Sequence, residues 1–187
     1  AGPSYSPSPV ITTTYYIGVS GDGVCENAIN TRKAVMVTVN PVAIAADITA
    51  DGITICNGST AALTAESSNV MTPVFRWYAD QTTTTVLSTG SVYNPVPTIT
   101  TTYYVSVSGD GICENAINTR KEVVVTVDPL AQASDIIVAD NTSCPGQAVS
   151  LVASSTTVTN PLFKWYEDQT TTTSLSTGTT YIPSPTV

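Results

Sequence analysis

The sequence contains no histidine, and only 11% of its residues are charged. Without histidine, the chain cannot form a Ser-His-Asp or Cys-His catalytic group or a histidine-based zinc site. Six Lys and Arg are outnumbered by 14 Asp and Glu, which gives a formal net charge of −8. A chain this acidic lacks the basic surface that nucleic acids require. We therefore expect no nucleic-acid partner.

Long apolar runs are also missing, although 42% of the residues are hydrophobic. No stretch approaches the roughly 20 apolar residues that are needed to span a bilayer, so we expect no direct membrane insertion. No stretch shows a helical period either. The apolar residues are largely Val, Ile and Ala, interspersed with Thr and Ser. Because β-branched side chains favour strands, this composition predicts an all-β fold.

The most informative feature of the sequence is an internal repeat. Residues 20–33 read SGDGVCENAINTRK, and residues 108–121, 88 positions later, read SGDGICENAINTRK. The same offset relates VFRWYADQTTTT at residues 74–85 to LFKWYEDQTTTT at residues 162–173. Such self-similarity is typical of a tandem array of modules.

The repeat divides the chain into three parts when Pro41 and Pro129 are taken as starting points. Residues 1–40 are then the C-terminal part of a repeat and contain its last strands. Residues 41–128 form a complete repeat, and residues 129–187 form the N-terminal part of another, without the last strands. The short junctions that contain Pro41 and Pro129 are expected to limit bending between neighbours.

Alternation of apolar and polar residues identifies the strands of one repeat and its core. Residues 103–108 and 121–127 alternate in this way, and the turn-rich residues 109–119 should join them as a hairpin. Two further strands contribute inward-facing side chains, whereas Tyr78 falls on the outer side and is expected to be exposed. The predicted core residues are Leu63, Phe75, Trp77, Tyr103 and Val105, with Trp165 as the copy of Trp77.

These positions resemble the core of an immunoglobulin domain. Such a domain places a core Trp on its third strand, between inward positions on the second and sixth strands, with a Tyr two residues before the latter. Trp77, Leu63 and Val105 match those positions, and Tyr103 matches the Tyr. The usual inter-sheet disulfide is replaced by aliphatic packing. We therefore expect tandem immunoglobulin-like β-sandwiches with a period of 88 residues.

A more specific pattern is formed by residues 56–59, 61–64, 75–78, 101–105, Cys113-Glu114 and 123–127. In these residues the repeat resembles the CHU_C-associated Ig-like domains of giant surface adhesins in Bacteroidota. It implies a secreted protein located at the cell surface or in a surface filament, exported by the type IX route and associated with gliding motility. The resemblance implies no catalytic residues.

Each repeat carries one cysteine beside its first turn and one in its last hairpin. These are Cys56 and Cys113 in the central repeat, with Cys144 and Cys25 as their copies. Two cysteines per repeat in a secreted protein predict disulfides. Two connectivities remain open: a bridge between Cys56 and Cys113, or bridges between successive repeats. The second is considered because immunoglobulin topology puts the first turn and the last hairpin at opposite ends of a sandwich, beyond the reach of a disulfide.

Little in the sequence suggests catalysis or metal binding. Asp80 and Glu114 lie in ordinary strand-end and turn contexts, so we do not expect them to act as a catalytic carboxylate pair. The Gly-Asp-Gly motif at residues 109–111 is interpreted as a turn rather than a calcium site. We expect no catalytic residue, no metal and no cofactor, and therefore no enzyme.

Three functions fit these expectations. The first is a structural region in the elongated extracellular stalk of an adhesin. The second is a filament subunit, in which residues 129–187 of one chain are completed by residues 1–40 of the next through strand complementation. The third is a carbohydrate-binding adhesive module. The expected partners are neighbouring copies of the repeat or chain and, in the third case, surface glycans.

Overall fold

The computed structural model describes residues 4–183, and the regular secondary structure of these residues consists of β-strands and two short 3-10 helices. The chain divides into two compact units, Ala1–Asp128 and Pro129–Val187. Residues 1–40 and 41–128 fall in the same unit. The all-β prediction is confirmed.

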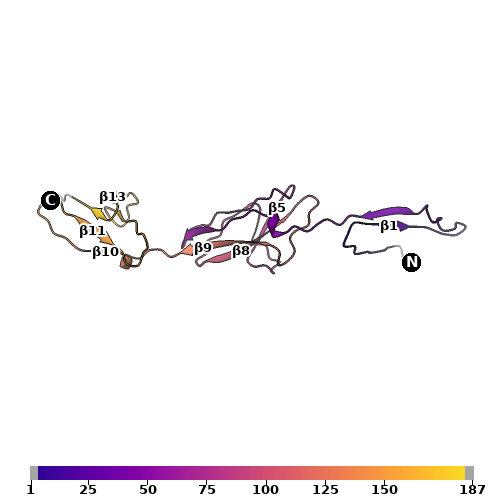
Figure 1. Ribbon diagram of the computed structural model, residues 1–187, viewed down its shortest axis with the longest axis horizontal. Helices are drawn as coiled ribbons and strands as arrows, with labels where there is room; N and C mark the ends of the chain where they lie inside the picture. Colours follow the sequence, from indigo (N-terminus) through magenta and orange to yellow (C-terminus); the bar gives the residue numbers. More distant parts are fainter. Residues whose placement is uncertain (1–3, 184–187) are drawn as a thin grey trace. The chain divides into compact units, whose positions relative to one another are not determined.

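The first strands of the chain form a hairpin. Strands β1 (Thr13–Ile17) and β2 (Lys33–Val37) pair antiparallel, with Tyr15 opposite Val35 (Figure 1). Between them, an isolated bridge joins Gly21 to Val24, which closes the turn that contains the first Gly-Asp-Gly motif.

Residues 41–128 form a sandwich with a large and a small sheet. Its elements are η1 (Ala45–Asp47), β3 (Ile53–Cys56), β4 (Leu63–Thr64), β5 (Val74–Tyr78), β6 (Ser88–Thr89), β7 (Val92–Tyr93), β8 (Thr101–Ser108) and β9 (Lys121–Asp128). The large sheet has the order β3-β9-β8-β5-β6, and β4 pairs with β7 in the small one. Strand β3 is parallel to β9, and the other pairs are antiparallel. Strands β8 and β9 lie side by side in Figure 1.

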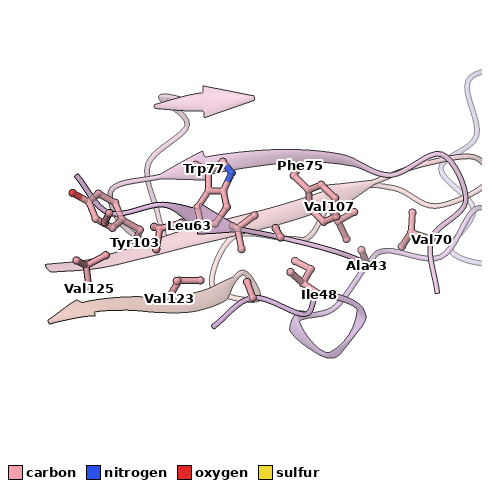
Figure 2. Packing of buried hydrophobic residues seen from close by; sticks show 14 of the residues in the cluster. Ala43, Ile48, Leu63, Val70, Phe75, Trp77, Tyr103, Val107, Val123 and Val125 are labelled. Carbon is pink, nitrogen blue, oxygen red and sulfur yellow. The ribbon is translucent and has the colours of Figure 1, made fainter. Parts of the chain in front are cut away.

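The core of this sandwich lies between the two sheets. Leu63 on β4 and Trp77 on β5 are fully buried, together with Val105 on β8 and Val123 on β9 (Figure 2). The Trp77 indole N–H donates to the carbonyl of Gly90 at 3.0 Å, so the one polar atom of the ring is satisfied. Alternate residues of β8 and β9 supply the inward face because successive strand side chains point to opposite sides.

Two glycines allow close backbone contacts in the central sandwich. A Cβ atom on Gly109 would lie 2.2 Å from the carbonyl oxygen of Met71, and one on Gly52 would lie 2.4 Å from that of Val124. Any larger residue at these positions would push the backbone segments apart. Gly109 begins the turn between β8 and β9, so its small size lets that turn pack against the residues before β5.

The second unit contains shorter strands. Its elements are η2 (Ala133–Asp135), β10 (Ile137–Val138), β11 (Leu151–Ser154), β12 (Lys164–Trp165), β13 (Ser176–Thr177) and β14 (Thr180–Tyr181). Strands β10, β11 and β14 form one small sheet, and β12 and β13 form another. The Trp165 indole N–H donates to the carbonyl of Gly178 at 3.0 Å, as that of Trp77 does to Gly90.

Candidate functional site

The carboxylate of Glu114 joins three side chains of the central sandwich. Its Oε1 atom accepts hydrogen bonds from the Tyr78 hydroxyl at 2.6 Å and the Ser106 hydroxyl at 2.5 Å. Its Oε2 atom accepts from the Arg76 guanidinium at 3.1 Å. Glu114 lies in the loop between β8 and β9, and its three partners lie on the outer face of the large sheet. The loop therefore folds back over that face.

Arg120, the residue before β9, closes the same cluster. Its guanidinium lies 3.4 Å from the centre of the Tyr78 ring, a close cation–π contact. One guanidinium nitrogen also donates to the carbonyls of Asp80 at 3.0 Å and Thr83 at 2.8 Å. The side chain thus ties the segment after β5 to the hairpin of β8 and β9. We call the group Arg76, Tyr78, Ser106, Glu114 and Arg120 the Glu114 cluster.

The pKa values of the cluster follow from these contacts. Partial burial raises the pKa of Glu114, but the hydrogen bonds from Ser106 and Tyr78 and the charge of Arg76 outweigh that effect and lower it overall. Burial raises the pKa of Tyr78, and the hydrogen bond to Glu114 raises it further. Glu114 is therefore held as a carboxylate and Tyr78 as a phenol. Both oxygens of Glu114 are occupied by fixed donors, which suits a structural role.

The cluster corrects one expectation from the sequence. The alternation predicts that Tyr78 lies on the outer, exposed side of its strand, yet it is only 3% exposed. It does point away from the core, but Glu114 and Arg120 cover it. The repeat gave no signal for this cluster, because residues 20–33 and 108–121 agree at every position except Val24 and Ile112. Near-identity of the whole block does not single out Glu114 or Arg120.

The predicted core residues occupy different environments in the two units. Leu63, Phe75, Trp77, Tyr103 and Val105 are buried in the central sandwich. Trp165 is only partly buried. Trp77 presents no ring face to solvent, so it offers no platform on which a sugar could stack.

Both parts that flank the central sandwich expose apolar side chains. On the hairpin of β1 and β2, Ile17, Val19 and Val35 are exposed. An open groove beside Tyr15 and Ile17 is also lined by Tyr5, Tyr16, Val35 and Val37. In the second unit, a groove is lined by Ile136, Val138, Ala153, Phe163, Trp165 and Tyr166. We call these two surfaces the hairpin face and the second-unit face.

The four cysteines are free and exposed, so the structure does not support the predicted disulfides, and of the two connectivities left open the bridge between Cys56 and Cys113 is not formed. Cys56 ends β3 and lies opposite Asp128, the last residue of β9. Cys113 lies beyond the other end of β9, where its N–H donates to the carbonyl of Pro41 at 2.9 Å. The length of β9, roughly 3.3 Å per residue, therefore separates them. A disulfide requires Cα atoms within about 7 Å.

The remaining candidate positions are structural. Gly111 has a φ of 71° and closes the tight turn between Gly109 and Ile112, where a positive φ favours glycine. The Asp80 carboxylate accepts hydrogen bonds from the N–H groups of Thr82 and Thr83, which stabilises the turn after β5. Among residues 4–183, no group of three or more Cys, Asp or Glu side chains is placed to hold a metal ion. No helix in the same part of the chain is long and apolar enough to cross a bilayer.

Comparison with known proteins identifies the central part of the chain. Residues 45–129 match the family described as "Ig-like domain CHU_C associated". A crystal structure of DIP-gamma IG1+IG2 is similar with 13% identity and a TM-score of 0.28, over 74% of this chain and 80% of that chain. No curated protein matches. The match to the family confirms the resemblance seen in the sequence: residues 45–129 of this chain belong to the CHU_C-associated Ig-like domains.

Proposed function

We propose that this chain is a structural, non-catalytic region of tandem Ig-like sandwiches, with a period of 88 residues, in the extracellular stalk of a bacterial surface adhesin. The family of residues 45–129 supports a module of the adhesion type at the cell surface. The tandem arrangement is supported by hydrogen bonds that recur at the repeat offset. Val19 and Val107, for example, each donate a backbone N–H to the side-chain oxygen of an Asn eight positions later.

The observation that carries this proposal is the short connection before the central sandwich. The N–H of Val39 donates to the Thr12 hydroxyl at 3.0 Å, which fixes the end of β2. The carbonyl of Pro41 accepts from Cys113, and the N–H of Ala43 donates back to Cys113 at 2.9 Å. Between these anchored positions lies only Asn40. So short a connection limits hinge motion, as a stalk that holds a distal tip away from the cell requires.

Small-angle X-ray scattering on the 187-residue chain tests this function. A compact chain of this length has a radius of gyration of about 16 Å. A stalk segment should exceed that value clearly at concentrations where it is monomeric. Replacing Pro129 by Gly should broaden the distribution of interatomic distances, whereas the exposed substitution Ile29→Ala should leave it unchanged. A radius of gyration near the compact value would overturn the proposal.

A further inference from the structure

The chain enters and leaves the central sandwich at opposite ends of its last strand, β9. It enters beside Cys113, where the carbonyl of Pro41 accepts the Cys113 N–H at 2.9 Å and Val42 forms a parallel bridge with the same residue. Cys113 follows the turn at the end of β8, and that end of β8 lies beside the start of β9. The chain leaves at Asp128, the last residue of β9, which spans about 26 Å. Tension on a tandem chain therefore acts along the axis of β9.

Strand β3, the first strand of this sandwich, runs parallel to β9. Their pairing begins with Ile53 opposite Val125. It ends where the Asn57 N–H donates to the carbonyl of Asp128 at 2.9 Å. Tension pulls β3 toward the start of β9 and pulls β9 toward its own end, so the two strands are sheared along their common axis. Shear stresses the hydrogen bonds between the strands together, whereas strands that are peeled apart from one end lose them one after another. Shear therefore requires the greater force.

Two smaller contacts hold the segment that precedes β3. Near the entry point, Pro41 and Ala43 make one hydrogen bond each with the backbone of Cys113, both at 2.9 Å. Further along, Thr49 and Glu66 form an isolated antiparallel bridge through two hydrogen bonds of 2.9 Å. Each of these contacts involves one position of the partner segment, whereas β3 and β9 are paired over four positions. The pair of β3 and β9 is therefore the longest backbone pairing that residues 41–57 make.

Side-chain packing strengthens the same pair. Gly52 precedes β3 and lets the two backbones approach, because a Cβ atom there would lie 2.4 Å from the carbonyl oxygen of Val124 on β9. Ile55 on β3 is 8% exposed and belongs to the core, and it lies opposite the partly buried Val127. Sliding β3 along β9 would move Ile55 out of its place in the core as well as break backbone hydrogen bonds. The burial of this apolar side chain therefore adds to the resistance.

We propose that the parallel pair of β3 and β9 is a mechanical clamp, which keeps the central sandwich folded while the chain is pulled from both ends. The clamp comprises residues 53–57 and residues 125–128. The inference rests on the proposed function in one respect: a stalk that holds a distal tip is pulled along its length. The shear geometry itself follows from the direction of β3 relative to β9, so it can be measured on the isolated chain.

Single-molecule force spectroscopy on the full chain tests the clamp by changing the direction of pulling. Handles on the two termini load β3 and β9 in shear, and unfolding of residues 41–128 releases about 300 Å of chain, which identifies the event. Handles on Cys56 and on Asp128→Cys, with the other three cysteines replaced by Ser, pull on two positions that lie opposite each other and so peel β3 from β9. Shear should require a force several times that of peeling at the same pulling speed. Equal forces in both directions would overturn the proposal.

Asn57→Pro tests the clamp with the handles kept on the termini. The substitution removes the N–H that donates to Asp128. The turn accepts proline, because its counterpart in the second unit has Pro145 at this position and a positive φ at the glycine that follows, as here. The variant should unfold about tenfold faster than the wild type at equal force, which corresponds to a barrier lower by about 1.4 kcal/mol.

Gly109→Ala is the matched control, because its Cβ atom would press on the carbonyl of Met71, outside the clamp. It should lower the stability in urea but leave the rate of forced unfolding nearly unchanged, since the contact with Met71 changes only after the clamp has given way. If Asn57→Pro unfolded at the wild-type rate, or if both variants accelerated forced unfolding equally, the clamp would be refuted.

The clamp and the stalk function fail in different measurements. A radius of gyration near the compact value would overturn the stalk and leave the difference between shear and peeling intact. Equal forces in the two pulling directions would overturn the clamp in a chain that scattering still shows to be extended.

Discussion

Replacing Glu114 by Ala should destabilise the central sandwich substantially, although its side chain is 34% exposed. The substitution leaves the Tyr78 and Ser106 hydroxyls without their acceptor, and both residues are buried. A buried hydroxyl that loses its partner costs about 1–3 kcal/mol. Water that enters beside the partly exposed site offsets some of this loss. We expect a decrease of about 2–3 kcal/mol in the free energy of unfolding.

Thermal unfolding followed by Trp77 fluorescence measures this effect, in a Trp165→Phe background so that only the central sandwich reports. For a domain of this size each kcal/mol corresponds to about 4–8 °C, so the unfolding midpoint should fall by about 10–20 °C. Glu114→Gln should lower the midpoint less than Glu114→Ala does, because its amide oxygen still accepts a hydrogen bond. Part of the loss remains, because the charge that faces Arg76 is removed.

The chain supplies a matched control for this prediction. Glu26 is the counterpart of Glu114, but it makes only an exposed ion pair with Arg32. Exposed pairs contribute about 0–1 kcal/mol, so Glu26→Ala should leave the unfolding of the monomeric chain nearly unchanged. If both Ala variants shifted the midpoint equally, or if Glu114→Ala had no effect, the structural role of the cluster would be refuted.

Three further predictions concern the same sandwich. The pKa of Glu114 is lowered from 4.5, so the stability that its carboxylate contributes is fully present above pH 4.5 and is lost as the pH falls through the lower pKa of the folded state. Urea titrations from neutral to acid pH should therefore show a steeper loss of stability for the wild type than for Glu114→Gln. Gly109→Ala should lower the urea midpoint by forcing the backbone near Met71 to move, at a cost of about 1–3 kcal/mol, whereas Gly21→Ala, with nothing within 4 Å, should not. Leu63→Ala should cost about 2–5 kcal/mol by calorimetry, and Leu151→Ala less, because Leu151 is only partly buried.

The strands that the sequence predicted well are those with a long alternating pattern. Strands β8 and β9 each span eight residues, and the inward set that includes Tyr103 and Val123 follows from period-2 alternation. Strands β6 and β7 span two residues each, which is too short for any period to be recognised. The tight turn at Gly111 follows from the need for positive φ.

The Glu114 cluster could not be predicted in the same way. Alternation states which side of the sheet a residue faces, and it correctly placed Tyr78 away from the core. It does not state what covers that side. The hydrogen bond between Tyr78 and Glu114 joins residues 36 positions apart, and it forms only because the loop between β8 and β9 folds back over the sheet. The separation of Cys56 and Cys113 could not be predicted either, because it depends on the direction of β3 relative to β9.

Because the repeats are nearly identical, more than one hairpin could pair with the strands of the central sandwich. The hairpin of β1 and β2 and that of β8 and β9 are copies, so either could in principle pair with β5, and neighbouring repeats of this kind are prone to such exchange. One difference favours the observed pairing: Ser106 donates to Glu114 at 2.5 Å, whereas its counterpart Gly18 has no hydroxyl to donate. A hydrogen bond to a charged group contributes about 1.5–3 kcal/mol, enough to bias the equilibrium at least tenfold. The exchange of Gly18 for Ser106 between the two copies therefore favours the hairpin of β8 and β9 as the partner of β5.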